Sequence, residues 1–329
     1  MKKSLLIGAA IFTSFTLAAC SNSKSPKQTY IDNYSSLSSQ SKNYNSQDIT
    51  IKFESFDMQG EAASEDINKL FDNSSLNIKA NVDYENKAVA VNTETKISDQ
   101  DVKFNMLLGK EGIYFENSQI KSLIDQFQTE NPYIGFYGAL LGQLEQKYLL
   151  IDSKSMESGM ASQTGADDTW STTYNQLFKE SKVNKEEIEK NFKDIPEKAF
   201  TKSGDKTTMK LSGDGDDVLA YLKKSLTDTN KAQIQPMIDN LEKYTDIKSL
   251  DVETTLNAKT HESEAKIRGN IQSKDGKTSA QFKISTTAKA SKAKASITEP
   301  AAKDAMSVSQ LLSGLNDAMT DTSQDVNVY

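Results

Sequence analysis

Apolar and polar side chains alternate with a period of two residues along two long stretches of the chain. The first stretch begins near Ile49 and is clearest from Leu76 to Phe115, where short polar turns separate four runs. The second extends from Val252 to Ile297 and again contains four runs. Runs of this length, joined by short polar turns, predict two antiparallel meanders, each with one apolar face and one solvent-exposed face.

Between and after the meanders, the spacing of apolar residues changes to that of amphipathic helices. This spacing predicts helices at 120–127, 170–178, 185–192, 218–222, 234–241 and 306–315. Two meanders that bracket helices predict an α+β fold. We expect one large, bent antiparallel sheet of about ten strands, a half-barrel with the helices on its concave face, because large twisted sheets curl. The alternative is two separate α+β domains.

A more apolar segment, Tyr133–Leu144, mixes aromatic residues with glycines. Glycine inside a helix costs about 1 kcal/mol, so this composition indicates a need for mobility or close approach. Two interpretations stay open: a gate or wall of an apolar cavity, or a helix that simply covers the sheet. The candidate cavity or gate residues are Tyr133, Phe136, Gly138 and Leu141.

The first twenty residues have the three parts of a secretory signal peptide. Lys2 and Lys3 precede a short apolar run from Leu5 to Leu17, which ends in the small-residue sequence Leu17-Ala18-Ala19-Cys20. A membrane-spanning helix needs about 20 apolar residues, and this run is shorter. We therefore expect residues 1–19 to be a signal peptide that is removed on export.

The sequence Leu17-Ala18-Ala19-Cys20 resembles the bacterial lipobox, in which the cysteine thiol receives a diacylglyceryl group. The resemblance implies lipidation at Cys20 and a location at the outer, extracytoplasmic face of the cell membrane. Two acyl chains hold a protein stably, whereas one holds it marginally. Cys20 is the only cysteine, so it forms no internal disulfide, which weakens the alternative of an ordinary secreted protein. The polar composition of residues 20–46 predicts a lipidated N-terminus and a flexible linker, within which Tyr30, Ile31 and Tyr34 could start a short helix.

The remaining boundaries follow from where the alternating and helical patterns end. We expect one half-barrel domain over residues 47–317, built from two meander-plus-helix halves, and a flexible tail over residues 318–329.

The 329 residues carry a net charge of −7, which becomes −9 when Lys2 and Lys3 leave with the signal peptide. An acidic chain with dispersed lysines does not favour nucleic acid as a partner. Arg268 is the only arginine, so bidentate clamps for phosphate or carboxylate are nearly excluded.

Candidate catalytic and metal-binding residues do not form a constellation in the sequence. His261 is the only histidine and lies in a polar turn, whereas a catalytic triad needs an oriented, buried imidazole and zinc needs several ligands. The acidic sequence 214–217 lacks the ligand spacing of an EF-hand, and we interpret it as a turn and helix N-cap. We therefore expect no catalytic residues, no metal and no cofactor, and no enzymatic activity.

The lipobox, the polar linker, the two meanders around helices and a closing Ile297-Thr298-Glu299-Pro300 together resemble a known group. They are similar to the mycobacterial LppX/LprG lipoproteins and the wider LolA/LolB-like class. The resemblance covers most of residues 47–317 and rests on architecture. It implies a half-barrel with helices across its mouth that encloses a lipid or other apolar ligand. The alternative is a surface interaction protein with a filled core that binds a protein or a cell-wall partner.

Overall fold

The computed structural model describes residues 24–38, 44–61, 63–97, 100–127, 144–153, 155–156, 170–179, 184–226, 228–311 and 313. The predicted signal peptide, with Leu17, Ala18 and Ala19, lies outside the described residues, as does Cys20. The candidate gate residues Tyr133, Phe136, Gly138 and Leu141 also lie outside them.

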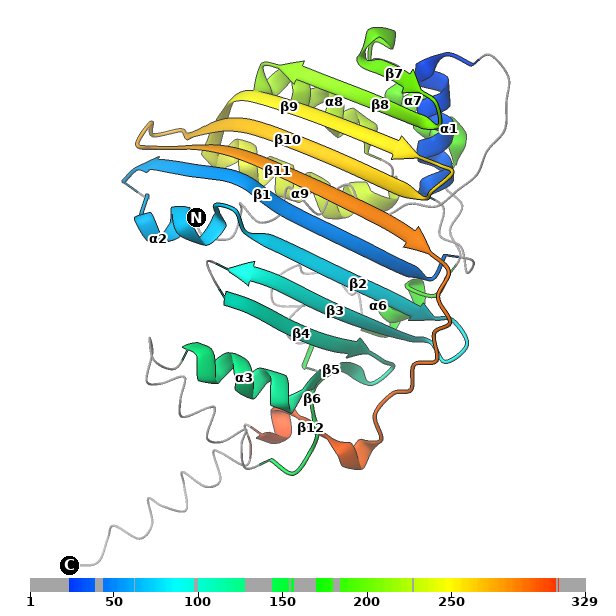
Figure 1. Ribbon diagram of the computed structural model, residues 1–329, viewed down its shortest axis with the longest axis vertical. Helices are drawn as coiled ribbons and strands as arrows, with labels where there is room; N and C mark the ends of the chain where they lie inside the picture. The colour runs from blue at the N-terminus through cyan, green and yellow to red at the C-terminus, as the bar shows by residue number, and fades with distance from the viewer. Residues whose placement is uncertain are drawn as a thin grey trace, which may run out of the picture. The chain divides into compact units, whose positions relative to one another are not determined.

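The strands form a single open sheet of twelve strands in the order β12-β6-β5-β4-β3-β2-β1-β11-β10-β9-β8-β7 (Figure 1). Among the described pairings, β12–β6 is parallel and the others are antiparallel. The prediction of an α+β fold with one large, mostly antiparallel sheet is confirmed, with twelve strands in place of about ten. The strands are β1 (Ser46–Gly60), β2 (Ser75–Asp83), β3 (Ala88–Ile97), β4 (Gln100–Leu108), β5 (Gly112–Glu116), β6 (Tyr148–Asp152), β7 (Phe200–Ser203), β8 (Lys206–Gly213), β9 (Thr245–Asn257), β10 (Glu262–Ser273), β11 (Thr278–Ser291) and β12 (Ala305–Ser307).

Helices occur at the N-terminal end of the described chain, after β1, after β5 and between β6 and β9. None of the described helices is both long enough and apolar enough to cross a membrane. The helices are α1 (Pro26–Leu37), α2 (Glu65–Phe71), α3 (Asn117–Phe127), α6 (Trp170–Gln176), α7 (Lys185–Phe192), α8 (Gly215–Ser225) and α9 (Asp228–Tyr244), with short 3₁₀ turns η2 (Glu197–Ala199) and η3 (Ala302–Asp304).

The two meanders meet through their long strands β1 and β11, which are far apart in the sequence. These strands pair antiparallel from Ser46 opposite Ser291 to Gly60 opposite Thr278. A β-bulge between Phe53 and Ser55 shifts the register, so that Phe53 and Phe56 are both buried.

The chain divides into two compact units, which are described separately. Unit 1 comprises Met1–Lys79, Glu94–Asp101 and Glu180–Ala293, and unit 2 comprises the rest. In unit 1, the apolar faces of β8 to β11 pack against α1, α7, α8 and α9. Its fully or nearly fully buried side chains include Tyr30, Leu37, Ile188, Phe192, Met209, Val252 and Leu256.

Helix α1 lies within residues 20–46, which the sequence predicts as a flexible linker. The structure corrects this boundary: the folded part includes residues 26–37, and Tyr30, Ile31 and Leu37 are at most 3% exposed. The helix begins where Ser25 caps it, with the backbone N–H of Gln28 donating to Ser25 Oγ at 3.2 Å. The apolar residues are few, but their helical spacing places them on one face, which is sufficient for burial.

The segment after β11 differs from the sequence pattern, whose fourth run ends at Ile297 and predicts a separate strand there. Strand β11 instead continues to Ser291, and residues 292–301 form neither strand nor helix. Alternating side chains are more and less exposed along this segment, which explains why it has the sequence pattern of a strand. The predicted terminal helix at 306–315 also begins later, at residue 308, because residues 305–307 pair with β6 as β12.

Asp83 fixes the segment after residue 293 to the turn that follows β2. Asp83 as a whole is 4% exposed, and its carboxylate accepts hydrogen bonds from Asn86 Nδ2 at 2.8 Å and from the backbone N–H of Ile297 at 2.9 Å. The backbone N–H groups of Glu85 and Asn86 also donate to it, each at 3.0 Å. The backbone hydrogen bonds of Asn86 and Ile297 are the main reason that the pKa of Asp83 lies below its usual value.

Replacing Asp83 with Ala is expected to lower the free energy of unfolding by roughly 1–3 kcal/mol at neutral pH, because partly buried donors lose a charged acceptor. A lowered pKa means that the carboxylate stabilises the fold above its unfolded value of about 3.9 and loses this effect as the pH falls through the lower folded value. The difference between wild type and variant in urea unfolding should therefore shrink in strong acid. Glu85→Ala, in the same turn but exposed, is the control; an equal loss in both variants would contradict this role.

Candidate functional site

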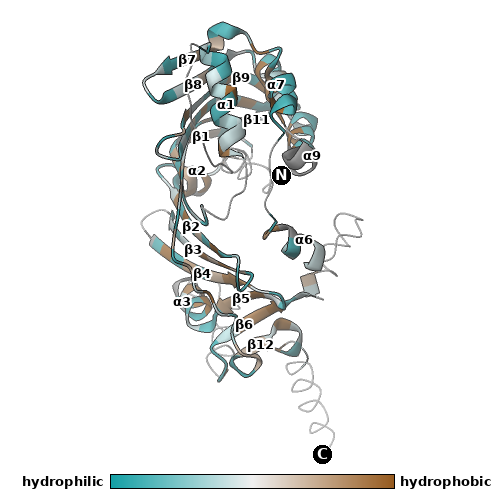
Figure 2. Cartoon of the chain, turned by 90° about the vertical axis from the view of Figure 1, so that its right-hand side faces the viewer, coloured by the Kyte–Doolittle hydropathy of each residue, from teal (hydrophilic) through white to brown (hydrophobic). Residues whose placement is uncertain are grey.

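An apolar cavity of about 150 Å³ lies inside unit 1, between the sheet and the helices. Figure 2 shows α7 and α9 on one side of the strands of this unit. Strands β1, β8, β9, β10 and β11 supply one wall and helices α1, α7, α8 and α9 supply the other. The lining residues are Tyr30, Tyr34, Phe53, Phe56, Phe192, Met209, Leu219, Leu222, Ser225, Leu226, Ile234, Ile238, Leu241, Leu250, Val252, Ile267, Ile271, Phe282 and Ile284.

The two walls follow from the two periodicities of the sequence. On β9 and β11, residues two apart point to the same face of the sheet, so Leu250 and Val252 face the helices, as do Phe282 and Ile284. On α9, apolar residues recur at helical spacing, and Ile238 is 7% exposed. The helices and strands thus turn their apolar faces toward the same space.

Gly269 shapes the sheet side of the cavity. It lies opposite Phe282 in the register of β10 and β11. A Cβ atom on Gly269 would lie 2.5 Å from Cζ of Phe282, which is closer than atoms pack, so the ring covers the glycine. Any larger residue at position 269 would displace the Phe282 ring, which lines the cavity.

The electrostatic character of the cavity is neutral. None of the described lining residues carries a charge. The hydroxyl of Ser225, which also lines the cavity, is satisfied because it donates to the backbone oxygen of Leu222 at 2.7 Å. Tyr30 is 1% exposed, and its burial raises the pKa of the phenol far above its ordinary value, so it stays neutral at physiological pH. Burying an unpaired charge is costly, so this cavity suits an uncharged hydrocarbon group.

Helices α8 and α9, which cover the cavity, are joined by an ion pair. Lys223 of α8 lies 2.6 Å from Oε1 of Glu242 and 3.8 Å from Oδ1 of Asp239, both on α9. At the end of α8, the side-chain amide of Asn191 donates to the backbone oxygen of Leu226 at 2.8 Å. These contacts hold α7, α8 and α9 together as the helical side of the cavity.

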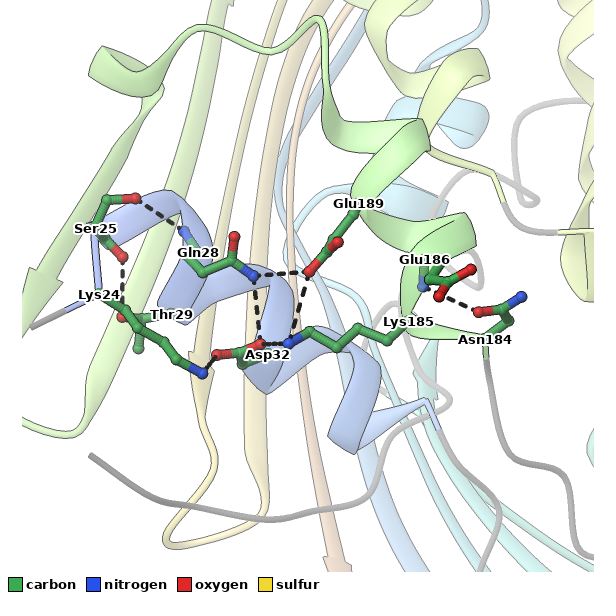
Figure 3. Close-up of polar contacts among 9 residues, drawn as sticks. All are labelled: Lys24, Ser25, Gln28, Thr29, Asp32, Asn184, Lys185, Glu186 and Glu189. Atoms are coloured by element: carbon green, nitrogen blue, oxygen red, sulfur yellow. Dashed lines mark hydrogen bonds and ion pairs between the residues drawn. The ribbon is translucent and has the colours of Figure 1, made fainter. Parts of the chain in front are cut away.

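Helix α1, which contributes Tyr30 and Tyr34, is held to α7 by a polar cluster (Figure 3). Asp32 lies 2.6 Å from Nζ of both Lys24 and Lys185. Partial burial alone would raise the pKa of Asp32, but the hydrogen bonds and charges of the two lysines outweigh it and lower the pKa. The cluster makes α1 a fixed wall of the cavity.

Other residues singled out in the sequence lie away from the cavity lining. His261 lies in the turn between β9 and β10, as predicted, with a positive φ of 56° and its ring 4.3 Å edge-on from Tyr44. Burial lowers the pKa of His261. Asp214 caps α8, as predicted, and accepts a hydrogen bond from the backbone N–H of Asp216 at 3.0 Å. The described residues contain no cluster of His, Cys, Asp and Glu that could hold a metal ion.

The apolar faces of the strands could be predicted from the sequence, whereas a cavity between sheet and helices was expected only from the architectural resemblance. The signal for Leu250, Val252, Phe282 and Ile284 is the period of two, which equally fits a filled core. The sequence signal for the burial of Tyr30 is the helical spacing of apolar residues within the polar stretch 20–46.

A second, polar groove of about 350 Å³ lies on the same strands of unit 1, mostly on the face away from the helices. Acidic, basic and hydroxyl side chains line it, and Lys289 pairs with Glu262 at 2.7 Å. The lining residues are Asp48, Thr50, Lys206, Thr255, Asn257, Glu262, Ser263, Glu264, Thr287, Ala288 and Lys289.

Comparisons with known proteins give no relative from which a function could be transferred. The chain matches no protein-family model. It also matches no curated protein. Among solved structures, the dehydratase domain from the terminal module of the rifamycin polyketide synthase aligns with 72% of this chain and 74% of that chain, at 9% identity and a TM-score of 0.13. A fusion DH domain aligns with 73% of this chain and 67% of that chain, at 10% identity and a TM-score of 0.11. Scores this low support no inference about fold or function.

Proposed function

We propose that this protein is a membrane-anchored, extracytoplasmic lipoprotein that binds a lipid or other apolar ligand between its sheet and its helices. The observation that carries the ligand proposal is the uncharged, apolar cavity of unit 1. The lipobox-like sequence ending at Cys20 carries the proposal of the anchor. In this proposal the sheet acts as a half-barrel, and the helices cover its concave face.

The size of the cavity limits what it accepts. Sites for small molecules usually occupy about 300–1,000 Å³, and this cavity has about 150 Å³. It therefore holds a short hydrocarbon segment, and a longer acyl chain requires α8 and α9 to move outward from the sheet. Each buried methylene contributes about 0.8 kcal/mol, so even a short segment of chain gives measurable affinity.

Replacing Ile238 with Trp is expected to fill the cavity and abolish co-purification of an apolar ligand. Ile238 points from α9 into the cavity, so the larger side chain takes the space of the ligand. Native mass spectrometry of an unlipidated form would detect bound acyl compounds in the wild type. Asn240→Trp places the same side chain on an exposed position of the same helix and should leave binding unchanged. Repeated absence of ligand from the wild type would refute the ligand proposal.

The second candidate is a surface interaction protein whose partner is a protein or a cell-wall polymer. The polar groove on the other face of the sheet favours it, because alternating charges and hydroxyls suit polar recognition. The two candidates differ in their sensitivity to Ile238→Trp: a partner held in the polar groove would bind the variant as well as the wild type.

A further inference from the structure

We propose that unit 1 presents one particular edge to the bilayer, at close range: the edge formed by the start of α1, the end of α7 and η2. The partner of this surface is the lipid headgroup layer of the membrane that holds the anchor. The inference rests on the proposed lipidation of Cys20, and it adds an orientation and a contact surface to it.

The length of chain between the anchor and the fold sets the range. Five residue steps separate Cys20 from Ser25, the N-cap of α1. A fully extended chain spans at most about 3.6 Å per residue, so Ser25 stays within about 18 Å of Cys20. Strand β1 alone has 15 residues, and its length at about 3.3 Å per residue is roughly 50 Å. The tether is thus much shorter than the unit that it holds, and the unit cannot turn freely above the membrane.

The position of Ser25 decides which edge of unit 1 lies nearest the anchor, because α1 is bound along its whole length. Near its start, Nζ of Lys27 donates to the backbone oxygens of Lys193 at 3.0 Å and Ile195 at 2.6 Å. Farther along, Asp32 pairs with Lys185 of α7 (Figure 3). Asn33 Nδ2 donates to Thr207 Oγ1 of β8 at 3.0 Å, in a buried hydrogen bond. The helix therefore transmits the position of the tether to the sheet.

The charges on this edge suit an anionic lipid surface. Lys193 and Lys198 lie on this edge, and Lys202 lies in the adjoining strand β7. All three are exposed, and none of them forms an ion pair with a residue in the described part of the chain. The nearby acidic side chains are engaged within the protein. Asp194 pairs with Lys224 at 3.1 Å, and Glu197 accepts from the backbone N–H of Lys27 at 3.4 Å. Lysines close to a membrane are attracted to anionic headgroups, although the whole chain is acidic.

This orientation brings the cavity close to the membrane. Tyr30, which lines the cavity, lies four residues after Pro26, and four residues of helix extend about 6 Å. One wall of the cavity therefore lies near the edge of unit 1 that faces the membrane.

Lipid quenching of site-specific fluorophores tests the orientation. The full lipidated protein is reconstituted in vesicles of phosphatidylglycerol and phosphatidylcholine in equal parts, with a headgroup-labelled quencher lipid. One variant carries a fluorophore at Lys198→Cys on the proposed edge, and the matched control carries it at Lys274→Cys. Lys274 lies in the turn between β10 and β11, and its N–H donates to the backbone oxygen of Tyr244, directly before β9. Thr254 of β9 pairs with Met209 of β8, which pairs with Phe200, the residue directly after η2. The control position lies next to the start of β9, nine residues along this strand from Thr254, which corresponds to about 30 Å.

Quenching at position 198 is expected to exceed quenching at position 274 several-fold. Inserting a long Gly/Ser spacer after Ser23 should remove most of this difference in quenching. If the difference stays unchanged with the spacer, the short tether does not cause it. Equal quenching at the two positions, in a protein that floats with the vesicles, would overturn the orientation and leave the anchor intact. A wild-type protein that does not float would overturn both.

Discussion

A chain that begins at Ser46 is expected not to form a stable unit 1, although the sequence pattern alone predicts a domain that starts at residue 47. The truncation removes α1 and leaves the hydrophobic core open where Tyr30, Ile31 and Leu37 are buried. Loss of a buried side chain of this size costs about 2–5 kcal/mol, so losing three costs on the order of the whole stability of a typical domain.

Urea unfolding followed by near-ultraviolet circular dichroism measures this effect. A chain that begins at Lys24 keeps α1 and its N-cap and serves as the control, with stability equal to that of the mature chain. Leu37→Ala, at a fully buried position, should destabilise the full chain by about 2–5 kcal/mol and shows whether α1 acts through its packing. A chain starting at Ser46 with an unchanged unfolding midpoint would contradict the place of α1 in the core.

The strands were predictable where one face of the sheet is buried and the other is exposed to solvent. The runs from Leu76 to Phe115 and from Val252 to Ile284 correspond to β2–β5 and β9–β11, because alternation directly reflects the two faces of a sheet. The pairing of β1 with β11 was not predictable, since nothing local specifies a partner more than 200 residues away. The segment 293–297 shows the converse: its polar and apolar side chains alternate, but it pairs with no strand in the described part of the chain.

The packing of helix α1 into the core and the residues that line the cavity escaped prediction for a related physical reason. The spacing of Tyr30, Ile31, Tyr34 and Leu37 is helical, but a short polar helix is marginal alone and is stabilised by packing against distant elements. Likewise, the apolar face of Leu250 and Val252 indicates burial without showing whether the space opposite is filled. That depends on how α8 and α9 pack, which is a property of the whole unit.

Replacing Cys20 with Ala is expected to release the protein from the membrane almost completely, while units 1 and 2 stay folded. A diacylglyceryl cysteine supplies two acyl chains, and each buried methylene contributes about 0.8 kcal/mol, so losing both chains removes far more binding energy than the lysines near α1 provide. The change precedes Ser25 and the polar cluster around Asp32, so the unfolding midpoint should stay that of the wild type.

Membrane flotation and acyl labelling of the cells measure the two consequences of Cys20→Ala separately. The variant should move to the soluble fraction and lose the acyl label, whereas Ser23→Ala, which changes the tether but not the anchor, should keep both. The short tether makes the test strict, because an unlipidated protein also loses the enforced proximity of Lys193, Lys198 and Lys202 to the headgroups. If Cys20→Ala still floats with membranes, the lipid anchor is not what holds the protein, and the lysine-bearing edge would have to bind the bilayer by itself.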